Sequence, residues 1–172
     1  MMDDTQQKQL EGMMKRPIPK KRIGVIRLQM VREGCLYGMK RFSQPWEAVE
    51  LVRPLFDMVD REMVAVMSLS TKLEPLALEI AAVGGINVCS VDVRDIFKHS
   101  LLNNAAFVIC FHNHPSGDPE PSRADRLLTK RIEDSGRLLG IPLIDHIIVG
   151  ETGFYSFLQN GLIHGTEPDS AA

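Results

Sequence analysis

The amino-acid sequence predicts an α/β domain in which helices pack on a mixed β-sheet. Two short apolar segments, Met63–Leu69 and Ala105–Phe111, are rich in β-forming residues and predict buried strands. Ser122–Leu139 instead has apolar residues three or four positions apart, which predicts an amphipathic helix. Strands that alternate with helices along a chain are typical of an α/β sandwich.

The first 40 residues combine a polar segment with a predicted β-hairpin. Residues 1–22 are polar, rich in methionine and interrupted by prolines, so we expect a poorly packed, flexible segment with a short helix at Gln6–Met14. Ile23–Arg32 is rich in β-formers, and a weaker strand continues to about Lys40. A glycine between the two runs favours a hairpin.

The folded domain is expected to span residues 23–165, followed by a disordered polar tail at 166–172. Further strands are predicted at Leu76–Val83, Leu143–Val149 and Phe154–Phe157. One further helix begins near Ser43 and Pro45, and another is capped by Ser90 or Asp92. The core-facing positions expected on these two helices and on Ser122–Leu139 are Trp46, Val49, Val52, Phe56, Val93, Ile96, Phe97, Leu101, Leu127, Leu128, Ile132, Leu138 and Leu139.

Composition restricts the classes of function. The formal net charge of −2 gives no support for sequence-independent electrostatic binding of nucleic acid. A basic cluster between Lys15 and Arg22 is interpreted as part of a solvated leader, with a phosphate-binding arm as the alternative.

The cysteines and the apolar runs indicate a cytoplasmic protein. Cys35, Cys89 and Cys110 are far apart and odd in number, so we expect free thiols in a reducing compartment. Cys89 and Cys110 lie among apolar residues and are expected in the core. No run is long enough for a membrane span, and the first residues lack the apolar region of a secretory signal.

The segment FHNHPSGDPEPSRAD carries a metal-ligand pattern. His112 and His114 are two residues apart, so in extended backbone both imidazoles lie on one side of the strand end. A turn rich in proline and glycine follows, and the helix that begins at Ser122 returns Asp125 toward the strand. Two imidazoles and one carboxylate leave a fourth zinc position open for water, which is typical of catalytic zinc sites.

Such a site also needs a base, and Glu79 is the predicted one. It interrupts the apolar run LALEIAAV, where an unpaired buried carboxylate would be costly. Glu74 is the second choice, because it precedes a proline in a turn where we expect it to be solvated. Ser122 is expected to hydrogen-bond the developing oxyanion of the transition state.

Each of these residues also has a purely structural interpretation. Ser122 and Asp125 have the spacing of a helix-capping pair, a role that does not exclude catalysis. Glu79 alternatively lies exposed on an edge strand. His146 is expected to be structural or to orient a ligand, whereas His99 and His164 are expected in solvent.

The spacing His112-x-His114, seven residues, Ser122, two residues, Asp125 matches the JAMM motif of JAB/MPN+ metalloproteases. The longer stretch of sequence around this motif, including DHIIVG and FYSF, resembles the RadC family of bacterial proteins over roughly Trp46 to Leu158. The resemblance implies a cytidine-deaminase-like α/β sandwich. It also implies zinc ligation by His112, His114 and Asp125, with the motif serine at Ser122 and the upstream glutamate at Glu79.

The resemblance favours a zinc-dependent hydrolase that acts on peptide or isopeptide bonds of a protein or peptide substrate, and the ligand set favours zinc over manganese or iron. Two other functions compete with it. One is a DNA-repair-associated protein that binds or cuts DNA, although the first 40 residues contain no sign of the helix-hairpin-helix region of full-length RadC-type proteins. The other is a metal-stabilised interaction module without turnover.

Overall fold

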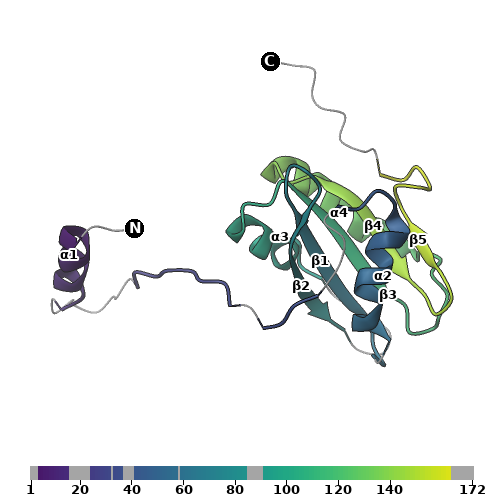
Figure 1. Cartoon of the computed structure of the whole chain (residues 1–172), viewed down its shortest axis with the longest axis horizontal. Coiled ribbons are helices and arrows are strands. Elements are labelled where there is room, and N and C mark those ends of the chain that lie inside the picture. Colours follow the sequence, from purple (N-terminus) through teal and green to yellow (C-terminus); the bar gives the residue numbers. More distant parts are fainter. Residues whose placement is uncertain are drawn as a thin grey trace, which may run out of the picture.

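A five-stranded mixed sheet forms the centre of the protein. The computed structural model describes residues 4–15, 24–31, 33–36, 41–57, 59–84 and 91–163. Within these ranges the strand order is β2-β1-β3-β4-β5 (Figure 1). The β3–β4 pair is parallel and the other pairs are antiparallel. The strands are β1 (Met63–Leu69), β2 (Pro75–Val83), β3 (Phe107–Asn113), β4 (Leu143–Val149) and β5 (Phe154–Ser156).

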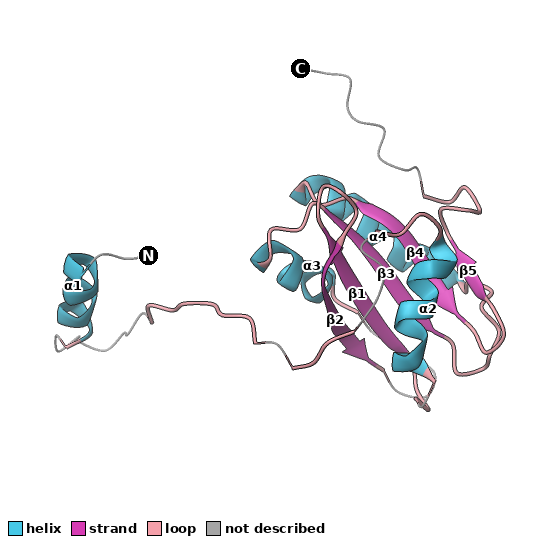
Figure 2. Ribbon diagram, in the orientation of Figure 1, coloured by secondary structure: helices cyan, strands magenta, loops and turns pink. Residues whose placement is uncertain are grey.

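Helices cover both faces of the sheet, which confirms the predicted α/β class. Helix α2 (Pro45–Phe56) lies on one face, and α3 (Val93–Leu102) and α4 (Arg123–Leu139) lie on the other (Figure 2). Asp92 caps α3, and Gly140 ends α4 in the left-handed conformation, with φ of 69°. No helix among the described residues is long and apolar enough to cross a membrane.

Alternation along the strands assigns each side chain to one of two cores. Val64 and Val66 of β1 pack with α3 and α4, whereas Ala65 and Met67 pack with α2. In β3, Cys110 faces α3 and α4, as expected for a core thiol. Since side chains two residues apart share a face, the side chain at position 112 also points toward α4. Cys89 lies outside the described residues.

The buried face of α4 differs from the predicted one. Leu127 and Leu138 were expected in the core, but they are 58% and 87% exposed, and Leu139 is also exposed. The helix instead buries a mixed row, Asp125, Thr129, Ile132, Glu133 and Gly136. A Cβ atom at Gly136 would lie 2.6 Å from the carbonyl oxygen of Ile141, so the close approach of the following loop requires glycine there. Ile132 confirms one predicted position, and Leu128 packs partly buried against the same core. Counting apolar residues failed for the others because the candidate metal group and close packing place polar and small residues on the buried side of α4. Trp46 on α2 and Leu101 on α3, also predicted to face the core, are 47% and 51% exposed.

The predicted N-terminal hairpin is wrong for the part of it that the structure describes. Residues 24–31 and 33–36 form no strand, and all of them are exposed; residues 37–40 lie outside the described ranges. The β-forming residues favour extended backbone, but a strand also needs a neighbour for its hydrogen bonds. The predicted helix near the start is confirmed as α1 (Asp4–Met14), which buries none of its residues.

Asp145 on β4 makes the stability of the fold depend on pH. Its carboxylate accepts hydrogen bonds from the Ser156 hydroxyl at 2.5 Å and the Leu158 amide at 2.9 Å. Burial nevertheless dominates and raises the pKa of Asp145 to about 6. Because the pKa of Asp145 is higher in the folded protein than in the unfolded chain, the protonated side chain stabilises the fold fully at pH values below the unfolded pKa. This stabilisation is lost as the pH rises through 6.

We therefore expect Asp145→Asn to gain stability relative to the unsubstituted protein as the pH rises from 4 to 7, by roughly 2 kcal/mol, because the unfolded carboxyl is already about half ionised at the lower end of this range. Urea unfolding of both proteins across this range measures the difference. A difference that does not change with pH would contradict the assignment.

Candidate metal centre

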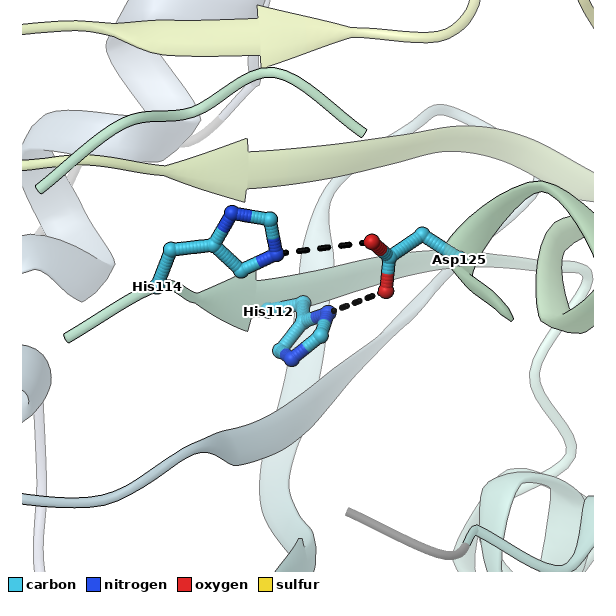
Figure 3. A group of neighbouring side chains, drawn as sticks. All are labelled: His112, His114 and Asp125. Atoms are coloured by element: carbon cyan, nitrogen blue, oxygen red, sulfur yellow. Dashed lines mark ion pairs between the residues drawn. The ribbon is translucent and has the colours of Figure 1, made fainter. Parts of the chain in front are cut away.

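Three side chains from two elements meet at the end of β3 (Figure 3). His112 is the second-last residue of β3, and His114 directly follows that strand. Asp125 lies in the first turn of α4. His112 Nδ1 is 3.1 Å from Asp125 Oδ1, and His114 Nε2 is 3.4 Å from Asp125 Oδ2. One potential ligand atom from each residue lies within 4.8 Å of the others. The structure therefore brings together all three predicted metal ligands.

The ring of His114 is oriented by the backbone. Its Nδ1 lies 2.7 Å from the carbonyl oxygen of Asp118, and because a carbonyl only accepts, Nδ1 must donate the proton. In the neutral imidazole, Nε2 then carries a lone pair that faces a carboxylate oxygen of Asp125. Two electron-rich atoms in this arrangement need a positive charge between them, from a proton or from a metal ion. The second hydrogen bond of a metal-bound histidine typically has this form.

His112 supports the same conclusion. Its side chain is 5% exposed; Nδ1 lies 3.1 Å from Asp125 Oδ1 without the geometry of a hydrogen bond, and Nε2 makes no hydrogen bond within the described part of the chain. A buried polar atom without a hydrogen-bond partner destabilises the folded state, and a histidine nitrogen can instead bind a metal ion through its lone pair. The residues present therefore fit a divalent cation.

Asp125 is ionised in this setting. Burial opposes its ionisation, but contacts with His112, His114 and Ser122 outweigh burial and hold the pKa of Asp125 well below its usual range. The same carboxylate raises the pKa of His114. An ionised carboxylate beside two imidazoles is a suitable ligand set for zinc.

Ser122 has the capping role that its spacing suggested. Its amide donates to Asp125 Oδ2 at 2.7 Å, and its hydroxyl accepts from the Asp125 amide at 3.2 Å. These two bonds hold the Asp125 carboxylate over the strand end. Because the hydroxyl acts as an acceptor here, its own proton is available to another group.

A buried series of hydrogen bonds, from His146 through Thr129 to the backbone of Asp125, holds the start of α4. The Thr129 hydroxyl donates to the backbone carbonyl of Asp125 at 2.7 Å, so His146 Nδ1 must be the donor in its own 2.7 Å contact with Thr129. Burial lowers the pKa of His146 to about 3. His146 is therefore a neutral structural residue that positions the first turn of α4, in agreement with the sequence analysis.

The predicted base, Glu79, is not brought to this group. It lies on β2 opposite Val66, and its Oε2 is 2.9 Å from His99 Nδ1 on α3. β1 lies between β2 and β3 in the sheet, so Glu79 is one strand removed from the strand that carries His112. His99, expected in solvent, is instead buried, and burial lowers its pKa to about 4. A carboxylate within an apolar run does need a partner, but a histidine on the facing helix is that partner, so the structure gives Glu79 no contact with the metal ligands.

Glu62 is the carboxylate that lies beside the metal group. It directly precedes β1, and its Oε2 is 3.9 Å from His112 Nε2. Asn113 holds this stretch of backbone, because its side chain accepts from the Met63 amide at 2.6 Å and donates to the Arg61 carbonyl at 3.1 Å. Sequence reasoning missed both residues. An antiparallel β1–β3 pairing would have revealed Glu62, since it places the start of β1 beside the end of β3.

A tight turn after β4 supports the loop that carries His114. The His114 amide donates to the Val149 carbonyl, and the Glu151 amide donates to the Gly117 carbonyl. Arg53 on α2 holds this turn by donating to the carbonyls of Gly150 at 3.0 Å and Gly153 at 3.3 Å. The ligand loop therefore depends on contacts from α2 and β4.

Gly150 is the position where this support tolerates no side chain. A Cβ atom there would lie 2.4 Å from the Gly117 carbonyl oxygen and 2.8 Å from Pro119. We expect Gly150→Ala to cost about 1–3 kcal/mol of stability, as overpacking generally does, and to weaken metal binding. Urea unfolding and chelator competition measure the two effects. Gly153→Ala in the same turn is the matched control, because a Cβ at Gly153 meets nothing within 4 Å; equal effects of the two substitutions would contradict the packing argument.

Comparison with known proteins agrees with this geometry. The model of a family described as the RadC-like JAB domain matches residues 42–162. This chain belongs to the RadC-like JAB domain family. The match contains every strand and helix of the domain from α2 to β5, and it includes the three candidate ligands and Glu62.

Relatives of this RadC-like JAB domain chain occur in diverse prokaryotes under the name UPF0758 protein. A relative in Listeria monocytogenes is 41% identical over 117 residues, which cover 68% of this chain and 52% of the relative. One in Desulforamulus reducens is 36% identical over 153 residues, covering 83% of this chain and 67% of the relative. One in Thermotoga maritima is 43% identical over 103 residues, covering 60% and 46%. The chain thus spans about half the length of several of these relatives.

Proposed function

We propose that this chain is a zinc-dependent hydrolase of amide bonds, of either the peptide or the isopeptide type. The observation that carries the proposal is the convergence of His112, His114 and Asp125 with a separate carboxylate, Glu62, next to them. Catalytic zinc sites combine three protein ligands with an open position, and a general base lies nearby without binding the metal.

His112, His114 and Asp125 would hold the ion. When bound, zinc lowers the pKa of a coordinated water toward about 7 and polarises a carbonyl group. Two imidazoles and one carboxylate favour zinc over manganese, which prefers oxygen ligands. The Asp118 carbonyl keeps the His114 ring in the tautomer that leaves Nε2 free for a ligand role.

Glu62 takes the role of proton shuttle in place of Glu79. Its carboxylate is partly buried, with 22% of the side chain exposed, so it is shielded yet open to a substrate. It would accept a proton from the attacking water and pass the proton to the leaving amine. Asn113 positions it through the backbone on both sides of residue 62.

Ser122 would donate its hydroxyl proton to the oxyanion of the substrate. It is exposed at the start of α4, and its oxygen accepts from the Asp125 amide. A donor aimed at developing negative charge lowers the barrier of acyl transfer. This role is compatible with the cap that the structure shows.

The proposed substrate is a protein or peptide. The alternative, a protein that binds or cuts DNA, is motivated by the resemblance to RadC and by the basic cluster between Lys15 and Arg22, of which only Lys15 is among the described residues. Amide hydrolysis is preferred because two imidazoles, one carboxylate and a separate nearby carboxylate are the combination that zinc-dependent amide hydrolysis uses.

The test is metal analysis followed by a hydrolysis assay. The purified chain should bind one zinc ion and should cleave members of a peptide library or a lysine isopeptide conjugate. A chelator should abolish cleavage, and added zinc should restore it. A chain that binds zinc with full occupancy yet cleaves neither class of substrate would overturn the proposal and favour a metal-stabilised interaction module.

A further inference from the structure

Residues 24–31, here called the N-terminal arm, have the composition of a β-strand but pair with no strand among the described residues. Side chains alternate in extended backbone, so Ile26, Leu28 and Met30 share one side, which is wholly apolar, whereas the other side combines Arg27 and Gln29 with Val25 and Val31. The apolar side chains are strongly exposed, 80% for Ile26, 67% for Leu28 and 50% for Met30. A segment of this kind is expected to pair with a sheet edge.

The same chain presents a sheet edge of matching length. β2 pairs with β1 on one side and has no strand on its other side among the described residues (Figure 1). Ile80 of β2 is 38% exposed, and Leu78, two residues before it on the same side, packs on the core beneath α2. Leu76 is 46% exposed and lies at an irregularity of the β1–β2 pairing. A long edge with exposed apolar side chains is a template for another strand.

One antiparallel register pairs the N-terminal arm with β2 and matches side chains on both faces of the sheet. With Leu28 opposite Leu78, Ile26 lies opposite Ile80, which forms two apolar pairs in one row. Met30 then falls opposite Leu76, at the irregular end of β2. The same register sets Arg27 opposite Glu79 on the other face. A parallel arrangement with the same central pair would place Arg27 opposite Ala77 instead. The antiparallel register is therefore the one that matches charge as well as apolar contact.

Glu79 is suited to such a pair. Its side chain is 32% exposed, and its Oε2 contacts His99 Nδ1 at 2.9 Å, whereas Oε1 has Lys98 Nζ at 3.9 Å. Burial lowers the pKa of His99 to about 4, so this histidine brings no positive charge at neutral pH. A guanidinium from a neighbouring strand would supply a charged partner at the sheet edge.

We infer that the N-terminal arm of one chain adds to β2 of a second copy, in a reciprocal exchange that forms a dimer. Within one chain the arm runs away from the sheet toward α1, and no described strand covers the outer edge of β2 (Figure 1). Exchange between two copies covers both arms and both edges with the same contacts, which closes the assembly at two chains. This inference does not depend on the proposed enzymatic activity.

Charge reversal tests the register. The unsubstituted chain should sediment as a dimer, and Arg27→Glu or Glu79→Arg alone should raise the dissociation constant about tenfold or more, because each pair occurs twice. The combination of Arg27→Glu with Glu79→Arg in one chain should restore the dimer. Leu138→Asp, at a position 87% exposed on α4, is the control and should change nothing. A monomer, or a dimer indifferent to both single reversals, would overturn the inference.

Disulfide trapping distinguishes exchange from an arm that folds back on its own chain. Two variants, Leu28→Cys and Leu78→Cys, each carry Cys35→Ser to remove the exposed native thiol. Oxidation of the mixture should yield a covalent pair made of one chain of each kind, whereas a mixture of Leu28→Cys with Leu138→Cys should not. If a chain carrying both Leu28→Cys and Leu78→Cys closes on itself and the mixture gives no pair, the second copy is not the partner.

Discussion

Glu62→Gln should lower the rate of amide hydrolysis by about 10²–10⁴-fold, the range that a positioned general base contributes. The substitution keeps the shape of the side chain and removes its basicity. Zinc content should remain unchanged, because Glu62 Oε2 lies 3.9 Å from His112 Nε2 and Glu62 is outside the ligand group. Turnover of a cleavable peptide and elemental analysis of the same sample measure the two quantities.

Glu79→Gln is the matched control for that experiment. The same chemical change is made on β2, where the carboxylate contacts His99 and Lys98 instead of the metal ligands. Hydrolysis should stay close to that of the unsubstituted chain when both are compared at the same concentration. If Glu79→Gln loses activity and Glu62→Gln retains it, the assignment of the base from the structure is wrong and the assignment from the sequence is right.

His114→Ala should abolish both zinc binding and hydrolysis. Removal of one of three protein ligands is expected to weaken affinity by more than the roughly 10–100-fold that loss of a ligand's hydrogen-bond partner causes. Competition with a chromogenic chelator measures the affinity. The protein should remain folded, because His114 follows β3 and is not part of either core cluster.

His99→Ala controls for the loss of a buried imidazole elsewhere. His99 is more buried than His114, and its partner Glu79 lies away from the metal group. Zinc affinity should be unchanged in this variant even if its stability falls. Equal zinc loss in both variants would indicate that the effect is a general disturbance of the fold, which would remove the support for His114 as a ligand.

Local signals in the sequence were sufficient for the ligand group. His112 and His114 lie two apart after an apolar strand, and Ser122 caps the helix that carries Asp125. Each of these relations spans few residues, so periodicity and capping rules determine them. The three ligands therefore followed from spacing alone, and β1, β4 and the caps of α3 and α4 were predicted on the same basis.

The base could not be predicted in this way, because its position depends on pairing between distant strands. Glu62 precedes His112 by many residues, and it is the β1–β3 ladder, with Val64 opposite His112, that brings the two together. Glu79 looked more unusual in sequence, since it interrupts an apolar run, but its partner His99 is on another element, α3, and is also too far along the chain for local spacing to identify it. Burial of a charge indicates that a partner exists and does not identify that partner.

The N-terminal arm illustrates a related limit. Its composition predicted a strand, and its backbone is extended, yet no described strand of this chain pairs with it. Intrinsic preference acts on each residue, whereas a ladder requires a second backbone. The sequence identifies a segment ready to pair without stating where its partner lies.

The location of Asn113 between the two histidines has a consequence for how this domain can diversify. Because His112 and the side chain that secures the proposed base are neighbours on β3, the spacing between these two groups is set by the central ladder. The loop that carries His114 and the first turn of α4 complete the group, and the turn after β4 holds that loop in place. Sequence change in segments that contact neither β3 nor this loop is therefore expected to leave the relative positions of these side chains unchanged.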